Sequence, residues 1–210
     1  MGYRKDIIAT GEIYHVFNRG VEKRPIVTTQ YDCQRWVDTI GYYRFIGVPT
    51  QFSLKNLAAT DGLDQQVSIL SYCLMPNHFH LLIEQLVDGG ITTFMQRAML
   101  SYSRYYNLKH DRVGPLMQGP YRARRIVTPE LLPHISRYHH LNPVVADMVS
   151  KPELYNWSSM KEYLGTSSTT ICDTQRILGQ FESADRYQAF VHDQIDYART
   201  LDAVKHGSWS

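Results

Sequence analysis

The hydrophobic and polar positions along the chain predict strands and helices in a clear order. Residues 12–18 (EIYHVFN) alternate between apolar and polar side chains and end at the turn 18–20, as in a half-buried strand. Two longer apolar segments, 67–75 (VSILSYCLM) and 78–85 (HFHLLIEQ), are separated by a Pro-Asn pair and predict two more strands. Residues 122–127 predict a short fourth strand.

Helical spacing of apolar residues predicts helices over residues 31–45 and 91–109. A third helix is expected to start from the Thr-Pro-Glu sequence at 128–130, with Pro133 delaying its regular part. We expect it to end near Asn142, because Pro143 disfavours continuation. The order strand, helix, strand, strand, helix, strand predicts an α+β fold of the ferredoxin-like (RRM-like) split β-α-β type. Two helices would cover one face of an antiparallel sheet and leave the other free for an active site.

Composition favours a soluble cytoplasmic protein. The chain has 210 residues, 43% of them hydrophobic, and three widely spaced cysteines without a Cys-x-x-Cys pair. Its first residues lack the apolar stretch of a signal peptide, and no apolar run is long enough to span a membrane.

The distribution of charge is more informative than the net charge of +2. Residues 97–125 hold seven basic side chains and one acid, whereas residues 182–202 hold five acids and two arginines. Tyrosines lie among the basic residues, at positions 102, 105, 106 and 121. Such residues could bind phosphates and stack on unpaired bases, so we expect a basic face that binds single-stranded nucleic acid.

The most distinctive segment is residues 75–83 (MPNHFHLLI). In a strand, side chains two positions apart lie on the same face, so His78 and His80 are expected side by side, about 7 Å apart at their Cα atoms. Two imidazoles at this spacing can bind one metal ion. Most such pairs in proteins are ordinary core or surface histidines, so assigning His78 and His80 as metal ligands depends on the flanking sequence.

That flanking sequence resembles the HUH motif of single-tyrosine transposases, especially the REP-associated tyrosine transposases of the HUH endonuclease superfamily. The motif reads YCLMPNHFHLLI at residues 72–83. Three further blocks resemble the family in the same order: YHV with NRG at 14–20, QG with YRA at 118–123, and YHHLNPV at 138–144. The chain departs from the common family pattern at Pro120, His139, Val145 and Asp147, none of which the chemistry requires.

The resemblance implies a divalent-metal-dependent nuclease that uses a tyrosine nucleophile. Tyr138 would attack, and His78 and His80 would bind Mg²⁺ or Mn²⁺. Two histidines leave an open site, and Asn142, one helical turn beyond Tyr138, is the candidate third ligand. His134, one turn before Tyr138, could touch the leaving oxygen or lie on the surface. The expected DNA-binding residues are Arg19, Gly20, Arg104, Tyr121, Arg122, Arg124 and Arg125.

The family's function would then be cleavage and rejoining of single-stranded DNA beside palindromic hairpins, through a 5′-phosphotyrosine intermediate. Residues 1–150 would form the transposase domain, and residues 151–210 a helical or irregular extension packed on it or following it. The protein would act in the cytoplasm near the nucleoid of a prokaryote, as a monomer or a homodimer. Two alternatives stay open: a hairpin-binding protein with little strand transfer, and an unrelated metal hydrolase that uses His78, His80 and Glu84.

Overall fold

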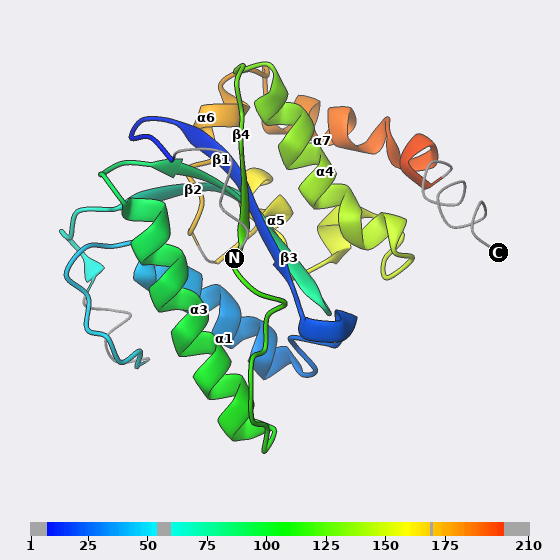
Figure 1. The fold of residues 1–210 in the computed structure, drawn as a ribbon. Helices are drawn as coiled ribbons and strands as arrows, with labels where there is room; N and C mark the ends of the chain where they lie inside the picture. The colour runs from blue at the N-terminus through cyan, green and yellow to red at the C-terminus, as the bar shows by residue number, and fades with distance from the viewer. Residues whose placement is uncertain (1–7, 54–59, 169, 200–210) are drawn as a thin grey trace.

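The computed structural model describes residues 8–53, 60–168 and 170–199, and a four-stranded antiparallel sheet lies at its centre (Figure 1). Its strands are β1 (Ile13–Arg19), β2 (Val67–Met75), β3 (His78–Gln85) and β4 (Arg122–Arg125), in the order β2-β3-β1-β4. β1 pairs antiparallel with both β3 and β4, and β2 pairs antiparallel with β3. This arrangement confirms the predicted α+β, ferredoxin-like class.

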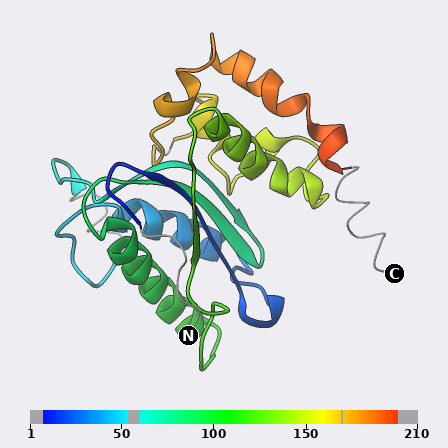
Figure 2. The ribbon, with the colours of Figure 1, turned by 45° about the horizontal axis from the view of Figure 1, so that its top comes forward.

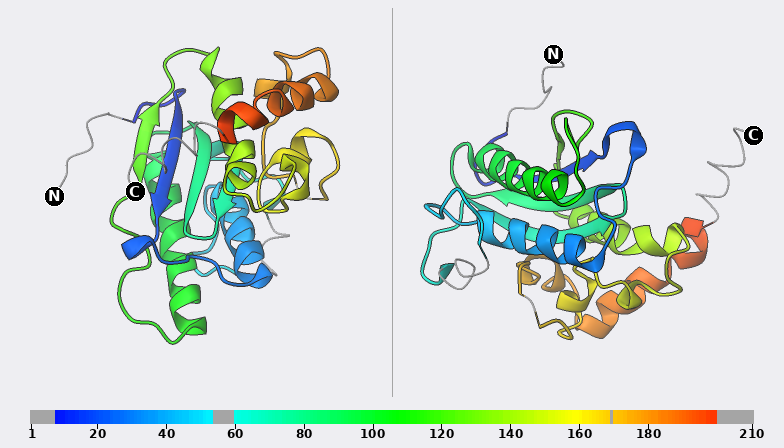
Figure 3. Two further views of the ribbon diagram at one scale, coloured as in Figure 1. Left: turned by 90° about the vertical axis from the view of Figure 1, so that its right-hand side faces the viewer. Right: turned by 90° about the horizontal axis from the view of Figure 1, so that it is seen from below.

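Two helices, α1 (Gln30–Tyr43) and α3 (Gly90–Lys109), lie side by side on one face of the sheet (Figure 3). Alternation along the strands supplies the apolar side of this core. Tyr14 and Val16 of β1, with Phe79 and Leu81 of β3, point toward the helices and are fully buried. The predicted helices and strands on this side therefore form within a few residues of their expected ends.

The sequence predicted that the opposite face of the sheet would be free, but in the structure this face is partly covered. Helix α4 (Leu131–Val145) crosses it and packs on β2 and β3 (Figure 2). Outside α4 lie the short helices η3 (Pro152–Leu154), α5 (Met160–Tyr163), α6 (Gln175–Leu178) and α7 (Ala184–His192). A second core joins Leu70 and Leu82 of the sheet to Leu141 of α4 and Tyr187 of α7. Among the described residues, the β1 and β4 side and the His78 end of this face line an open cleft.

The expected end of the third helix was wrong. Pro143 lies inside α4, which continues to Val145. Pro143 lacks the N–H that would bond the His139 carbonyl, but the chain continues to turn, because the amides of Ala146 and Met148 donate to the carbonyls of Asn142 and Pro143. The start also differs: Pro133 lies in the first turn, where the amides have no partner within the helix anyway.

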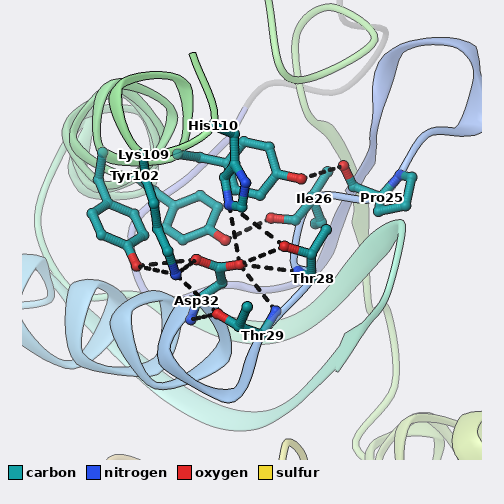
Figure 4. A network of polar contacts seen from close by, with 10 residues as sticks. Pro25, Ile26, Thr28, Thr29, Asp32, Tyr102, Lys109 and His110 are labelled. Carbon is teal, nitrogen blue, oxygen red and sulfur yellow. Dashed lines mark hydrogen bonds and ion pairs between the residues drawn. The ribbon is translucent and has the colours of Figure 1, made fainter. Parts of the chain in front are cut away.

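A polar network ties the start of α1 to the end of α3 (Figure 4). The buried Asp32 carboxylate accepts hydrogen bonds from Lys109 Nζ at 2.7 Å, from Tyr105 Oη at 3.0 Å, and from the amides of Thr28 and Thr29. Burial alone would raise the pKa of Asp32, but the hydrogen bonds from Lys109 and Thr28 outweigh it and lower the pKa. The network holds Asp32 ionised and clamps the two helices together.

This network and its surroundings correct the expected basic face. Lys109 binds Asp32, and Arg97 donates to the Val48 carbonyl, so neither is a simple solvated charge. Tyr102 and Tyr106 are buried and donate to the carbonyls of Ile26 and Pro25. They belong to the helical core and offer no surface on which bases could stack.

One further feature concerns the helices as a set. Among the residues that the structure describes, no helix has both the length and the apolar character that crossing a bilayer requires.

Candidate active site

The site begins with the two histidines of β3. His78 and His80 point to the α4 side of the sheet, and their rings lie 5.1 Å apart and nearly perpendicular. β1 runs alongside and places His15 on the same face, where its Nε2 lies 3.0 Å from His80 Nδ1. The strand register thus brings a third imidazole to the pair.

The hydrogen bonds of these rings leave nitrogen lone pairs for a metal ion. His78 Nδ1 lies 2.6 Å from Asn77 Oδ1, so this nitrogen carries the proton and Nε2 carries the lone pair. If His80 donates its Nδ1 proton to His15, then His80 Nε2 is also a lone pair, and this buried atom has no hydrogen-bond partner among the described residues. An unpartnered buried nitrogen beside a second ligand fits a divalent metal, with His15 orienting His80 from behind.

The protonation of the histidines agrees with a ligand role. Burial lowers the pKa of His15 and of His78 to about 4, aided by the positive charges of Arg124 and Arg19 respectively. Burial also lowers the pKa of His80 well below its ordinary value. Neutral imidazoles at neutral pH can bind a metal without first losing a proton.

Tyr138 faces this cluster from α4. Its ring lies 5.3 Å from the His80 ring and 6.2 Å from the His15 ring, each in an edge-on arrangement. The side chain is 49% exposed, which leaves it open to a substrate. A cleft of about 410 Å³ opens beside it, lined by Arg19, His78, His80, Gln118, Arg122 and Tyr138 among others.

Asn142 lies one turn beyond Tyr138 on α4. Its amide nitrogen donates to the Tyr138 carbonyl at 2.7 Å, which leaves Oδ1 as the atom able to bind an ion. His134, on the preceding turn, is exposed and its Nδ1 lies 3.0 Å from an Arg137 nitrogen. The structure thus brings His78, His80 and Tyr138 together, while His134 bonds within its own helix.

Residues 42–121 match the family model of IS200-like transposases. The match contains the HUH motif at His78 and His80 but ends before Tyr138. It bears out the resemblance found in the motifs.

A solved structure of a REP-associated tyrosine transposase bound to a REP hairpin has a similar fold, with a TM-score of 0.53. The two chains are 12% identical, and the similarity covers 82% of this chain and 98% of that one. At this identity the likeness concerns the fold. No curated protein matches the chain.

The arginines expected to bind DNA divide between the two faces of the sheet. Arg122 and Arg124 of β4 pair with Phe17 and His15 of β1, so they lie on the Tyr138 side. Arg125 lies on the opposite side, where its guanidinium binds Glu12, with Nε to Oε2 at 2.9 Å. The sequence could not separate these neighbours until the register of β4 was known.

The other expected DNA contacts also differ in position. Arg19 lines the cleft at the end of β1. Arg104 lies exposed on α3, across the sheet from Tyr138. Tyr121 packs partly against the helical core. Gly20 is buried, and a Cβ there would lie 2.2 Å from the Arg24 carbonyl oxygen, so the glycine permits a tight loop.

Sequence reasoning gave no role to two histidines of the site. His15 lies in the first strand, and only pairing with β3 places it against His80. His139 follows Tyr138 and was noted only as a departure from the family pattern; it is fully buried, with its ring 5.5 Å from that of His80. The period-two pattern of β1 could have indicated His15, but no local pattern points to His139.

Proposed function

We propose that this protein is a metal-dependent transposase that cleaves and rejoins single-stranded DNA beside hairpins through Tyr138. The observation that carries the proposal is the placement of the half-exposed Tyr138 ring edge-on to His80, in a cleft that His78, Arg19 and Arg122 also line. The match to IS200-like transposases over the strand that bears both histidines supports it.

The proposed chemistry conserves atoms and charge. The Tyr138 oxygen attacks the phosphorus, forms a 5′-phosphotyrosine bond and breaks the bond to the 3′ oxygen. The phenol loses one proton and the leaving 3′ oxygen gains one. Attack by another 3′-hydroxyl on the phosphotyrosine reverses the step and joins new ends. Because the covalent bond preserves the free energy of the broken diester, no nucleotide triphosphate is required.

His78 and His80 would hold the ion, Mg²⁺ or Mn²⁺, with Asn142 Oδ1 as the third protein ligand. A bound divalent ion in such a site polarises the scissile phosphate and stabilises charge on its oxygens. All three ligands are neutral, so we expect weak metal binding in the free protein and tighter binding when the DNA phosphate adds an anionic oxygen. Arg19, Arg122 and Arg124 would bind neighbouring phosphates on the same face.

The packing of α4 supports attack within one chain. Ser71 of β2 hydrogen-bonds His139 of α4 at 2.8 Å, and Leu141 packs with Leu70 and Leu82 of the sheet. These contacts hold Tyr138 beside His80 and His15 of its own chain. We infer that the protein acts near the DNA of a prokaryote, as a monomer or a homodimer, on hairpins like the one in the REP-associated structure.

The test uses a labelled single-stranded hairpin with flanking sequence, incubated with the full chain and Mn²⁺. A covalent adduct that survives denaturation is expected for the parent protein, and Tyr138→Phe should abolish it while hairpin affinity changes by no more than a few-fold. Tyr197→Phe, which alters an exposed tyrosine beyond the end of α7, is the matched control. An adduct of undiminished yield in Tyr138→Phe would overturn the nucleophile assignment.

The two alternatives predict other outcomes. A hairpin-binding protein without strand transfer would bind the DNA and form no adduct. A hydrolase based on Glu84 would need that carboxylate near the metal, yet four residues of strand separate it from His80 by about 13 Å, and Arg176 pairs with it at 3.4 Å. Glu84→Ala should therefore leave cleavage nearly intact.

A further inference from the structure

Behind the His78–His80 pair lies a second group of nitrogen ligands. One ring nitrogen from each of His15, His80 and His139 lies within 4.8 Å of the other two. His139 Nδ1 is 2.8 Å from Ser71 Oγ, while its Nε2 is buried and has no hydrogen-bond partner among the described residues. A fully buried imidazole nitrogen without a partner is costly in an apolar interior, and this one lies beside two other imidazoles.

We propose that His15, His80 and His139 form a second metal site, which shares His80 with the His78–His80 pair and takes a borderline transition ion such as Zn²⁺. The spacing of His15 and His80 is close to that of tetrahedral coordination, and the His139 nitrogen, within 4.8 Å of the other two, would move closer on binding. With zinc–nitrogen distances of about 2.0–2.1 Å, two ligand nitrogens of a tetrahedral site stand about 3.3 Å apart. His15 Nε2 and His80 Nδ1 are 3.0 Å apart, so an ion requires them to separate by only a few tenths of an ångström.

The donor set selects the class of ion. Three neutral imidazoles favour zinc and its neighbours over Mg²⁺, which prefers oxygen ligands. His15 is partly exposed, and the neighbouring Tyr138 is half exposed at the edge of the cleft. An ion can therefore reach the site from solvent, and a water molecule can complete the coordination.

This site and the HUH pair need opposite protonation of His80. An imidazole bound to an ion through Nδ1 keeps its proton on Nε2. The HUH pair instead needs the Nε2 lone pair of His80, with the proton on Nδ1. Zinc on His15 and His139 therefore withdraws His80 from the HUH pair, and it should inhibit metal-dependent cleavage; this consequence, unlike zinc binding itself, rests on the proposed function.

The binding test uses the full chain without DNA and titrates it with Zn²⁺, measured by calorimetry, and with Co²⁺, measured by absorption. His139→Asn keeps an atom near Nδ1 for Ser71 and removes Nε2. Changes in outer-shell groups already cost 10–100-fold in metal affinity, so loss of this ligand should weaken zinc binding by about 100-fold or more. His78→Ala should retain the affinity, His80→Ala should lose it, and His134→Gln, on the exposed surface, is the control.

One measurement uses only the parent protein, so misfolding of a variant cannot affect it. Bound Co²⁺ should show the intense visible absorption of a tetrahedral complex. A weak octahedral spectrum, or zinc affinity lost in His78→Ala but kept in His139→Asn, would overturn the second site.

The inhibition test compares adduct formation in Mn²⁺ with and without added Zn²⁺. Zinc should lower the yield in the parent protein, and the ratio of the two yields should return toward one in His139→Asn. Equal inhibition in both proteins would refute the competition through His80. Absence of any adduct, with zinc binding intact, would count against the proposed function and not against the site.

Discussion

Replacing Tyr187 by phenylalanine should destabilise the contact between the C-terminal helices and the helix that carries the proposed nucleophile. The Tyr187 hydroxyl lies in a buried chain of hydrogen bonds. It is 2.9 Å from Ser136 Oγ and 2.8 Å from His140 Nδ1, and His140 Nε2 is 2.8 Å from Ser159 Oγ. The Tyr72 amide donates to Ser159 Oγ at 3.0 Å, so the chain links α7 and α4 to the sheet.

The order of the protons follows from the two ends of this chain. Ser136 donates to the Pro133 carbonyl at 2.9 Å, so its oxygen must accept from Tyr187. The Tyr187 oxygen then accepts from His140 Nδ1–H, and His140 Nε2 accepts from Ser159, whose Oγ lies nearer to this nitrogen (2.8 Å) than to the Tyr72 carbonyl oxygen (3.3 Å). Burial lowers the pKa of His140 to about 3, which agrees with this neutral tautomer.

Tyr187→Phe keeps the ring that stacks on Tyr163 at 4.7 Å and removes only the hydroxyl. One buried donor, His140 Nδ1–H, then loses its acceptor, while Ser136 keeps its bond to Pro133. A buried donor left without a partner costs about 1–3 kcal/mol. At about 2–4 °C per kcal/mol for a chain of this size, the expected fall in Tm is about 4–8 °C for a loss of 2 kcal/mol.

The assay is thermal and urea unfolding at neutral pH, followed by circular dichroism. Tyr197→Phe removes a hydroxyl from a side chain that is 61% exposed and should change Tm by no more than about 1–2 °C, because surface changes typically stay within about 0.5 kcal/mol. If Tyr187→Phe unfolds at the same temperature as Tyr197→Phe, the hydroxyl does not accept from His140. The proton order derived above would then be wrong.

Three further predictions concern charge. Arg122→Ala and Arg124→Ala should each weaken hairpin binding and flatten its salt dependence by about 0.7 in the log–log slope; Arg125→Ala should change the slope little, and equal slopes for all three would refute the division of faces. The folded-state pKa values of His15 and His78 are about 4 and that of His140 about 3, so below pH 6.5 the unfolded chain binds more protons than the folded chain. The free energy of unfolding should therefore fall as pH drops from 6.5 toward 4, by up to about 1.4 kcal/mol per pH unit for each histidine. Urea midpoints that stay level from pH 7 to 5 would contradict this prediction. Asp32→Asn should lower the free energy of unfolding by about 1.5–3 kcal/mol, because charged hydrogen bonds are lost. The exposed Asp88→Asn should leave it unchanged. Equal urea midpoints for the two variants would show that the Asp32 network does not stabilise the fold.

The sequence by itself determined the strands, the two core helices and the facing of His78 and His80. These features depend on local periods: alternation of two along a strand and spacing of three to four along a helix. The motif order also indicated Tyr138 before any contact was known, because a short segment carries the residue and its flanks together.

Contacts between distant segments decided the rest. Pairing of β1 with β3 placed His15 against His80, and pairing with β4 sent Arg124 and Arg125 to opposite faces. The packing of α4 on the sheet buried His139 beside His15 and His80. None of these outcomes has a local signature, because each depends on register and on which element covers which face. A run of basic residues looks continuous in the sequence, but the tertiary structure places Lys109 and Arg125 in ion pairs, Arg122 in the cleft and Arg104 on the exposed surface.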